Sequence, residues 1–489
     1  MAQEIDQVGV IRPFEGSAIE AWAHAADVVV VGLGCAGACA AIEAAEAGAE
    51  VLVLEAAAAG GGTSAMSGGI IYLGGGTPVQ QACGFDDTPE TMATFLRAAC
   101  GPGVDEAKLA AFCADCVEHF EWLVDHGVPF EGRYHPEHDR EPPDDSGLCY
   151  SGGEDAWPFN EITSPAPRGH HPKFPDAAGG FLMQRLIERV AACGVRVVTD
   201  AVVERLVVDA DGSVVGVEAA LDGVSSLIRS DRGVVLAAGG FTFNPEMVQQ
   251  HCPEVARVNV PIGTPFDDGR AIRMAQGVGA VTVGMEHIEV GIPLAPPRSV
   301  VRGILVNAQG RRFINEDTYA GRVGKESLLG QDGQMYFVHS DDTFAVNIAG
   351  YQAKWVAETA EELEAEIGFP AGSLVDTLER YNRDAVDGRD PEFHKASEWV
   401  VPLHPPYGVV DMRVEKSFYA SFTLGGLRTA ADGSVVDDAG QAIGGLFAAG
   451  RTTAGIAGAG YVSGISLADA TYFGRRAGRA AAGSAPVVD

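Results

Sequence analysis

The chain has 489 residues, of which 46% are hydrophobic and 21% are charged, and its formal net charge is −33. These values are typical of an ordinary globular protein with more than one domain. The large negative charge argues against binding to nucleic acid or to anionic membrane surfaces, because both would repel the protein. No apolar run reaches the ~18 residues that a membrane-spanning helix needs, so no membrane span is expected.

The nine cysteines favour a reducing compartment over a disulfide framework, and we expect a cytoplasmic protein. The first residues of the chain lack the basic and then apolar order of a signal peptide. Cys113 and Cys116 form a CxxC pair, and the stretch from Tyr134 to Asp145 contains an HxxH pair. Neither pair is accompanied by a second one with ligand spacing, so no metal site is expected.

The first predicted element is a buried parallel strand over residues 28–31, which are all valine. Gly32, Gly34 and Gly37 follow it with GxGxxG spacing and open an alanine-rich helix, and a second strand is predicted over residues 51–54. Glycines at these places allow a tight turn, close approach of the backbone to a pyrophosphate, and close packing of helix on strand. The order of these parts predicts a dinucleotide-binding unit.

The residues after the second strand distinguish FAD from NAD. Glu55 ends that strand and can accept a hydrogen bond from a ribose hydroxyl. A loop of small residues over 56–76 then stands where a simple NAD domain would continue with strands and helices. Two further glycine-rich turns follow predicted strands within residues 233–241 and 444–482, and the second leads into a helix. We therefore expect FAD, bound by a discontinuous domain to which both ends of the chain contribute.

Several motifs, taken in order, are similar to those of the flavoprotein family that includes fumarate reductases, succinate dehydrogenases and 3-ketosteroid dehydrogenases. They are the GxGxxG turn, GGTSAMSGG, VVLAAGGF, DDGRAIRMAQGVGA, RRFINED, TLGGL and GGLFAAG. The resemblance implies an α/β fold in which a Rossmann-type FAD-binding domain is discontinuous and carries an inserted α+β capping domain. The expected limits are 24–283 and 405–489 for the FAD-binding domain and 284–404 for the cap, and proline-rich stretches lie near both boundaries.

The resemblance also implies which residues bind the cofactor. FAD is expected to be non-covalent, because TSAMSGG contains no histidine to which it could be attached. Arg451 departs from the family pattern, in which an acid or amide that bonds the ribityl chain often follows AAG. The residues expected to bind FAD are Gly32, Gly34, Ala36, Gly37, Glu55, Gly62, Thr63, Ser64, Ser67, Gly68, Gly69, Val203, Ala238, Gly239, Asp268, Gly450, Ser466 and Leu467.

The last glycine-rich turn separates the branches of this family. Fumarate-type members resemble one another in the arginines and histidines that clamp a dicarboxylate, but no arginine lies here between Arg451 and Arg475. Tyr319 instead follows RRFINED, and Tyr461 and Ser463 stand in the final turn. Two tyrosines at these places are similar to those of 3-ketosteroid dehydrogenases, and the serine resembles the Δ4-(5α) branch.

This resemblance implies 4,5-desaturation of a 3-keto-5α-steroid, with loss of a proton from C4 and transfer of a hydride from C5 to flavin N5. The Tyr461 hydroxyl and the Gly464 backbone N–H are expected to hold the C3 carbonyl oxygen. Ser463 and Tyr319 are expected to pass the C4 proton outward as a relay. Ser463 could instead cap the helix that begins near Ser466.

Other functions stay open at this point. A 3-ketosteroid Δ1-dehydrogenase would use an additional tyrosine, for which Tyr72, Tyr134 and Tyr150 are the candidates. A fumarate-reductase-like enone or alkene reductase would run a related reaction in the other direction. A flavin-dependent electron carrier needs no inserted cap with two tyrosines, so that class is disfavoured. The sequence indicates a small-molecule steroid substrate but no particular electron acceptor.

Overall fold

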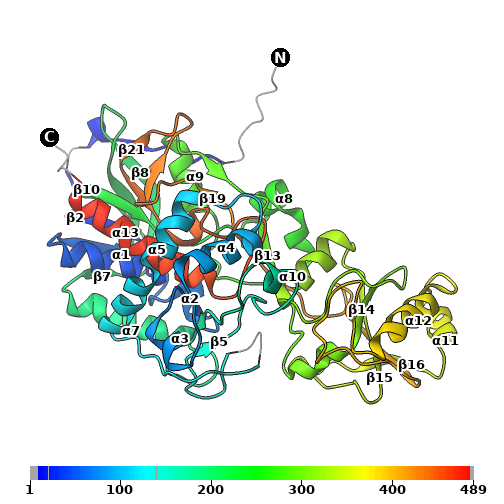
Figure 1. Ribbon diagram of the computed structural model, residues 1–489. Helices are drawn as coiled ribbons and strands as arrows, with labels where there is room; N and C mark the ends of the chain where they lie inside the picture. The colour runs from blue at the N-terminus through cyan, green and yellow to red at the C-terminus, as the bar shows by residue number, and fades with distance from the viewer. Residues whose placement is uncertain (1–8, 20, 138–140, 485–489) are drawn as a thin grey trace.

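The computed structural model describes residues 9–19, 21–137 and 141–484. It has two parts: a larger α/β body that contains both ends of the described chain, and a smaller lobe built from a middle section of it (Figure 1). This arrangement confirms the expected fold class, a discontinuous Rossmann-type domain with an inserted α+β cap.

The body is organised around a sheet with strand order β1-β8-β9-β10-β2-β3-β7, in which β21 lies beside β10 and β20 beside β21. β2 pairs in parallel with both β3 and β10, and the paired residues 28–31, 51–54 and 234–236 are buried and apolar, as strands covered on both faces must be. β21 runs parallel to β10, so the C-terminal segment completes the sheet that the N-terminal segment begins. The strands are β1 (Phe14–Glu15), β2 (His24–Val31), β3 (Val51–Leu54), β7 (Arg196–Val198), β8 (Ala201–Val208), β9 (Val214–Leu221), β10 (Val224–Leu236), β20 (Ser434–Val436) and β21 (Ala442–Ala448).

Helix α1 (Cys35–Glu46) and helix α13 (Ile465–Gly483) pack closely against each other beside this sheet. Gly474 and Gly478 permit the approach, because a Cβ on either would overlap the backbone oxygen of Ala36 or Ala40. Helix α13 therefore packs on α1 through small residues. The N-termini of the two helices are thereby fixed relative to each other.

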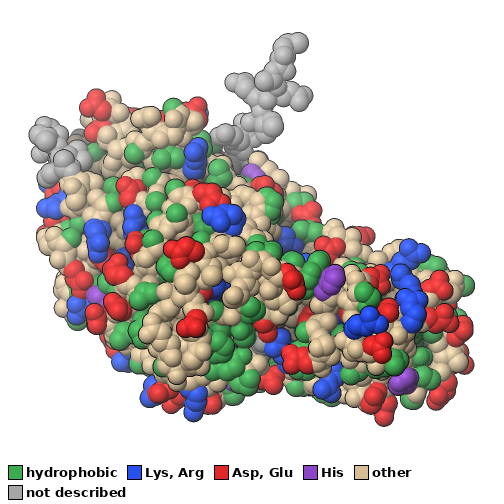
Figure 2. Space-filling model, in the orientation of Figure 1, with side chains coloured by type: hydrophobic (Ala, Val, Ile, Leu, Met, Phe, Trp, Pro, Cys, Tyr) green, Lys and Arg blue, Asp and Glu red, His purple; other side chains and the backbone are tan. Residues whose placement is uncertain are grey.

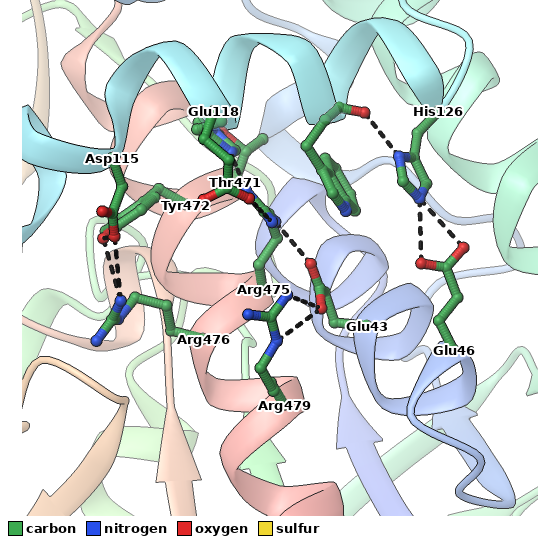
Figure 3. Close-up of polar contacts among 12 residues, drawn as sticks. Glu43, Glu46, Asp115, Glu118, His126, Thr471, Tyr472, Arg475, Arg476 and Arg479 are labelled. Atoms are coloured by element: carbon green, nitrogen blue, oxygen red, sulfur yellow. Dashed lines mark hydrogen bonds and ion pairs between the residues drawn. The ribbon is translucent and has the colours of Figure 1, made fainter.

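A buried ionic network ties the same two helices to α5 (Glu106–Asp125), as Figure 3 shows. Glu43 of α1 accepts hydrogen bonds from Arg475 Nε at 2.7 Å and from Arg479 Nη2 at 2.8 Å. Arg475 also donates to Glu118 Oε1 at 2.9 Å. Removing one partner would strand a buried charge, so the network specifies how the three helices fit together more than it adds net stability.

The smaller lobe is an antiparallel sheet with strand order β14-β15-β17-β16, covered by two helices (Figure 1). Its core joins Leu363, Leu374 and Leu378 of the helices to Val338 and Val409 of the sheet. The elements are β14 (Ile304–Asn307), β15 (Met335–Ser340), β16 (Ala353–Ala357), β17 (Tyr407–Asp411), α11 (Ala360–Ile367) and α12 (Ser373–Ala385).

Two strands near the junction bear on the domain limits. β17 belongs to the cap sheet although it lies beyond the expected boundary at 404/405. β13 (Ile288–Gly291) lies inside the expected cap range of 284–404, yet it pairs with β18 (Ala420–Thr423) at the junction. We therefore propose that the cap is entered after β13 and left after Asp411.

The remaining elements form small sheets and the helices around them. The strands are β4 (Ile71–Tyr72), β5 (Leu148–Cys149), β6 (Gly169–His170), β11 (Val260–Pro261), β12 (Thr282–Val283) and β19 (Gly426–Leu427). The helices are α2 (Gly62–Ala65), α3 (Pro78–Ala82), α4 (Pro89–Cys100), α6 (Phe159–Ile162), α7 (Gly179–Ala192), α8 (Pro245–His251), α9 (Arg270–Gly277) and α10 (Ala320–Lys325).

The described residues include no helix with the length and apolar character to cross a membrane, and no cluster of side chains that could hold a metal ion. Cys113 and Cys116 are buried within α5 as free thiols. The second histidine of the HxxH pair, His138, lies outside the described residues. Acidic side chains are spread over the visible face of both parts, in keeping with the negative charge (Figure 2).

Candidate active site

A cavity of about 1020 Å³ lies where the glycine-rich segments from distant parts of the chain meet. Its volume is at the upper end of the usual range for ligand sites, as expected for a site that holds a cofactor and a substrate together. Every residue expected to bind FAD lines it except Gly37, and Tyr319, Tyr461, Ser463 and Gly464 line it as well.

Gly37 is the exception, and the structure gives it a different role. A Cβ at this position would overlap the backbone oxygen of Gly32. Gly37 therefore lets α1 pack against the turn that precedes it, which is the third of the glycine roles expected from the motif. Gly37 is not among the described residues that line the cavity, so its direct contact with the cofactor stays a prediction.

The other two glycines of the motif face the cavity at the start of α1. Gly34 is the N-cap residue of this helix, and Ser64 Oγ accepts a hydrogen bond from Cys35 N, the first backbone N–H of the helix, at 3.2 Å. Glu55 accepts from Leu33 N at 2.7 Å and from Ala57 N at 2.8 Å, so its carboxylate holds the glycine turn in place. A carboxylate with two such bonds keeps acceptor capacity for a ribose hydroxyl. A helix N-terminus beside an acid fits the pyrophosphate and ribose of a dinucleotide.

Asp267 organises a second wall of the cavity and was missed in favour of its neighbour Asp268. It accepts hydrogen bonds from Thr63 Oγ1 at 2.6 Å, Gly240 N at 3.0 Å and Arg451 Nη2 at 2.9 Å. The Arg451 Nη1 atom is buried and makes no hydrogen bond within the described residues. Arg451 therefore keeps a cationic donor beside the glycine-rich turns that line the cavity, which we call the FAD cradle. This donor suits a polar oxygen of FAD and compensates for the missing acid or amide after AAG.

Tyr319 reaches the cavity from the start of α10, where it is the N-cap residue. Its hydroxyl donates to Glu289 Oε1 at 2.8 Å. Glu289 lies on β13, is 3% exposed and also lines the cavity. Burial raises the pKa of this carboxyl to about 7, while the hydrogen bond from Tyr319 and the charge of Lys325 limit the rise. Glu289 is a second residue that sequence reasoning missed, although an acid between Ile288 and Val290 in an apolar strand is an unusual placement.

Tyr461 forms an aromatic wall with two other rings. Its ring centre lies 5.5 Å from that of Phe422 and 6.5 Å from that of Tyr319. Burial raises the pKa of the Tyr461 phenol, and hydrogen bonding to Ser466 at the start of α13 opposes this rise. The hydroxyl is therefore a neutral donor at ordinary pH.

The backbone of the final turn needs glycine at position 464. Gly464 has φ +94° and is the N-cap residue of α13, and a Cβ there would lie 2.9 Å from Tyr72 N. Among the described residues, the side chain that bonds the backbone at the start of this helix is that of Tyr461, at Ser466, so the structure does not support the alternative role of Ser463 as a helix cap. Ser463 instead stands just before the helix and faces the cavity.

The candidates for an additional tyrosine lie elsewhere. Tyr72 is fully buried and its hydroxyl donates to Glu154 Oε1 at 3.0 Å. Tyr134 and Tyr150 pack against Phe85, with ring centres 5.1 and 6.3 Å from it. None of the three tyrosines is among the described residues that line the cavity.

Comparison with known proteins places this site in a family. Residues 27–467 match the FAD binding domain family. This chain belongs to that family. FAD is therefore its cofactor, and the fold and the glycine cradle agree with this assignment.

Three individual relatives show which enzymes this chain is similar to. A 3-oxo-5-alpha-steroid 4-dehydrogenase from Comamonas testosteroni is 29% identical over 89% of this chain and 94% of its own length. The crystal structure of a 3-ketosteroid-delta4-(5alpha)-dehydrogenase from Rhodococcus jostii RHA1, in complex with 4-androstene-3,17-dione, is 47% identical with a TM-score of 0.93 and covers 96% of this chain and 100% of that one. A 3-ketosteroid delta1-dehydrogenase from Sterolibacterium denitrificans shares the fold at 22% identity, with a TM-score of 0.71 over 94% of this chain and 99% of that one.

Proposed function

We propose that this protein is an FAD-dependent 3-ketosteroid dehydrogenase that removes hydrogen from C4 and C5 of a 3-keto-5α-steroid and yields the 4-ene-3-one. The observation that carries the proposal is the grouping of the Tyr319, Tyr461 and Ser463 side chains on one cavity with the FAD cradle. The likeness to two enzymes named for this reaction, one of them solved with a 3-ketosteroid, supports it.

The charges around the cavity favour a neutral substrate. Arg451 and Arg270 are the arginines among the described lining residues, and each is paired with an aspartate, at 2.9 and 3.1 Å. A dicarboxylate would need several cationic groups that converge on it, whereas the paired aspartates neutralise the charge of both arginines, although Arg451 Nη1 keeps one donor. The exposed apolar side chains of Met66, Phe266 and Phe418 also line the cavity, as a flat apolar ligand requires.

The chemistry divides between the cofactor and the protein. FAD supplies, at its N5 position, the acceptor for the hydride that leaves C5. The Tyr461 hydroxyl and the Gly464 N–H bind the C3 carbonyl oxygen and stabilise the negative charge that develops on it when C4 loses its proton. Ser463 and Tyr319 provide the hydroxyls through which that proton leaves.

The remaining alternatives are less well supported by the site. A Δ1-dehydrogenase would use a further tyrosine, but Tyr72, Tyr134 and Tyr150 do not line the cavity among the described residues. The pairing of both lining arginines disfavours a fumarate-type reductase. The nine cysteines are free thiols, so we keep a cytoplasmic location as part of the proposal.

The test is anaerobic addition of a 3-keto-5α-steroid to the FAD-loaded protein. We expect the flavin absorbance near ~450 nm to bleach in a single exponential phase and the 4-ene-3-one to form in equal amount. Succinate, added as the matched control at the same concentration, should leave the absorbance unchanged. Faster bleaching with succinate than with any 3-ketosteroid would overturn the proposal.

A further inference from the structure

Glu289 is a buried acid at the wall of the active-site cavity. It lies on β13, and its backbone oxygen accepts a hydrogen bond from the Ser421 hydroxyl of the neighbouring strand β18 at 2.6 Å. The side chain is 3% exposed and forms part of the cavity lining. A carboxyl group is almost never buried in this way without a partner, and no ion pair holds Glu289 within the part of the chain that the structure describes.

Its hydrogen-bond partner is a residue of the proposed reaction. The Tyr319 hydroxyl donates to Glu289 Oε1 at 2.8 Å, and both atoms are buried. A hydroxyl that already donates to a carboxylate oxygen can pass its proton along that bond when it receives another. Serine and tyrosine are poor final acceptors on their own, because a free phenol has a pKa of about 10 and an alcohol a far higher one.

We propose that Glu289 is the group that receives the C4 proton, which reaches its carboxylate through the Tyr319 hydroxyl. This inference rests on the proposed steroid dehydrogenation. The C4–H bond breaks, its proton adds to the hydroxyl relay, and the Tyr319 O–H proton moves to Glu289 Oε1. The C5 hydride carries the electron pair to FAD, and the protonated Glu289 carboxyl later releases its proton to solvent. Glu289 thus acts through Tyr319 and does not touch the substrate.

The surroundings of Glu289 agree with this role. Burial raises its pKa to about 7, so near neutral pH it is available as a base and can also release the proton again. The titratable groups that face it are Tyr319 and Lys325 from α10, Tyr461 from the final turn and Cys100 from the end of α4. The hydrogen bond from Tyr319 and the attraction of Lys325 oppose the rise in the pKa of Glu289, and burial in turn lowers the pKa of Lys325.

The chain contains a matched control for the variant. Glu154 is fully buried, its pKa is raised to about 7 by burial, and it accepts from the hydroxyl of Tyr72 at 3.0 Å. Unlike Glu289, it is not among the described residues that line the cavity. Glu289→Gln and Glu154→Gln therefore change the same chemistry in the same kind of environment, and only one of them faces the substrate.

The first experiment measures the Glu289 carboxyl directly, without substrate. Infrared spectra of the FAD-loaded protein are recorded between pH 5 and pH 9 for the wild type, Glu289→Gln and Glu154→Gln. We expect a protonated-carboxyl band that titrates near pH 7 and is absent from the Glu289→Gln spectra alone. If the Glu289→Gln spectra keep every band that the wild type has, Glu289 does not titrate in this range and the inference is wrong.

The second experiment follows flavin bleaching by a 3-keto-5α-steroid over the same pH range. The wild type and Glu154→Gln should share an acid limb in kcat/KM with an apparent pKa near 7. Glu289→Gln should lose about 10²-fold or more in kcat, with little change in KM, and should lose the limb. Glu289→Asp keeps a carboxylate and should recover part of the rate. The double variant Tyr319→Phe/Glu289→Gln should be little slower than the slower single variant, because both changes break one path.

The outcomes separate the two claims. If the wild type turns over the steroid and Glu289→Gln has the same rate and the same acid limb in kcat/KM, the inference is wrong and the proposed function stands. Absence of steroid turnover in the wild type would overturn the proposed function, whereas the infrared titration would still report the Glu289 carboxyl. If Glu289→Gln fails to fold, Glu289→Asp carries the test: a rate equal to that of the wild type with the limb unmoved would contradict the inference.

Discussion

Ser151 and Ser463 hold each other through two hydrogen bonds, although 312 residues separate them. Ser463 N donates to Ser151 O at 3.2 Å, and Ser151 Oγ donates to Ser463 O at 3.0 Å. These bonds use only the backbone of Ser463, together with the backbone oxygen and the hydroxyl of Ser151. The Ser463 hydroxyl is left to face the cavity, which is the arrangement that a proton-relay group requires.

The first prediction follows from this pair. Ser463→Ala should leave the melting temperature unchanged, because the side chain caps no helix, and should lower kcat by ~10²–10⁴. Ser151→Ala should instead affect stability. It removes a hydrogen bond that orders the turn and should lower the free energy of unfolding by about 1 kcal/mol. Thermal unfolding and steady-state kinetics of both variants check this. A Ser463→Ala protein with normal turnover and a lower melting temperature would assign Ser463 a purely structural role.

The second prediction concerns Tyr461. Tyr461→Phe keeps the ring that packs against Phe422 and removes the hydroxyl, which is the donor to the steroid C3 oxygen and also bonds Ser466. The loss should cost ~10²–10³ in kcat, as for an oxyanion-hole donor, while KM changes much less. Phe422→Leu, which alters packing but no donor, is the control and should affect KM more than kcat. If Tyr461→Phe instead raised KM by the same ~10²–10³ and left kcat unchanged, Tyr461 would bind only the ground state of the substrate.

The third prediction separates two glycines of the same motif. Gly34 has φ −79°, and a Cβ there would meet no described protein atom closer than 3.4 Å, so Gly34→Ala should fold. Its methyl group would stand where the backbone meets the cofactor and should weaken FAD binding by about 1–3 kcal/mol, which is about fivefold or more. Gly37→Ala should instead yield little folded protein, because its methyl group overlaps Gly32. Circular dichroism and flavin titration distinguish these cases. Full FAD loading of Gly34→Ala would contradict the claim that the backbone at Gly34 contacts the cofactor.

These glycines also illustrate how much of the fold can be predicted from the sequence. The order of strand, GxGxxG turn, helix, strand and acid predicts the dinucleotide unit because each residue acts locally, and the structure matches it within a few residues at β2, α1 and β3. The C-terminal strand and helix were likewise predicted from a glycine-rich turn between apolar segments. Local patterns therefore predicted the body of the fold.

Contacts between distant segments could not be predicted in this way. Asp267 was passed over for Asp268 because only the fold shows which of two adjacent acids meets Thr63 and Arg451. Glu289 was missed because its role depends on Tyr319, 30 residues away, and on burial that no motif records. The pairing of β17 with β15, on which the proposed shift of the boundary at 404/405 rests, joins segments that are distant in the sequence.

The fourth prediction concerns the pH dependence of stability. Burial raises the pKa of Glu154 to about 7 from its ordinary 4.5, so the folded state binds this proton more tightly than the unfolded chain does. The resulting stabilisation is present in full below pH 4.5 and is lost as the pH rises through about 7. Glu154→Gln does not titrate, so its stability relative to the wild type should increase between pH 5 and pH 8, by at most about 3 kcal/mol. Urea unfolding at both pH values tests this, and a difference that is constant or falls with pH is incompatible with a raised pKa.

The central claim is that the C4 and C5 hydrogens of a 3-keto-5α-steroid are the ones removed. Single-turnover bleaching of the FAD-loaded protein with substrate deuterated at C4, at C5 or at C1 and C2 tests it most directly. We predict slower bleaching with the C4 and C5 substrates, no effect of deuterium at C1 and C2, and a 4-ene-3-one as the product. Slower bleaching with the C1 and C2 substrate, together with a 1-ene product, would contradict the account.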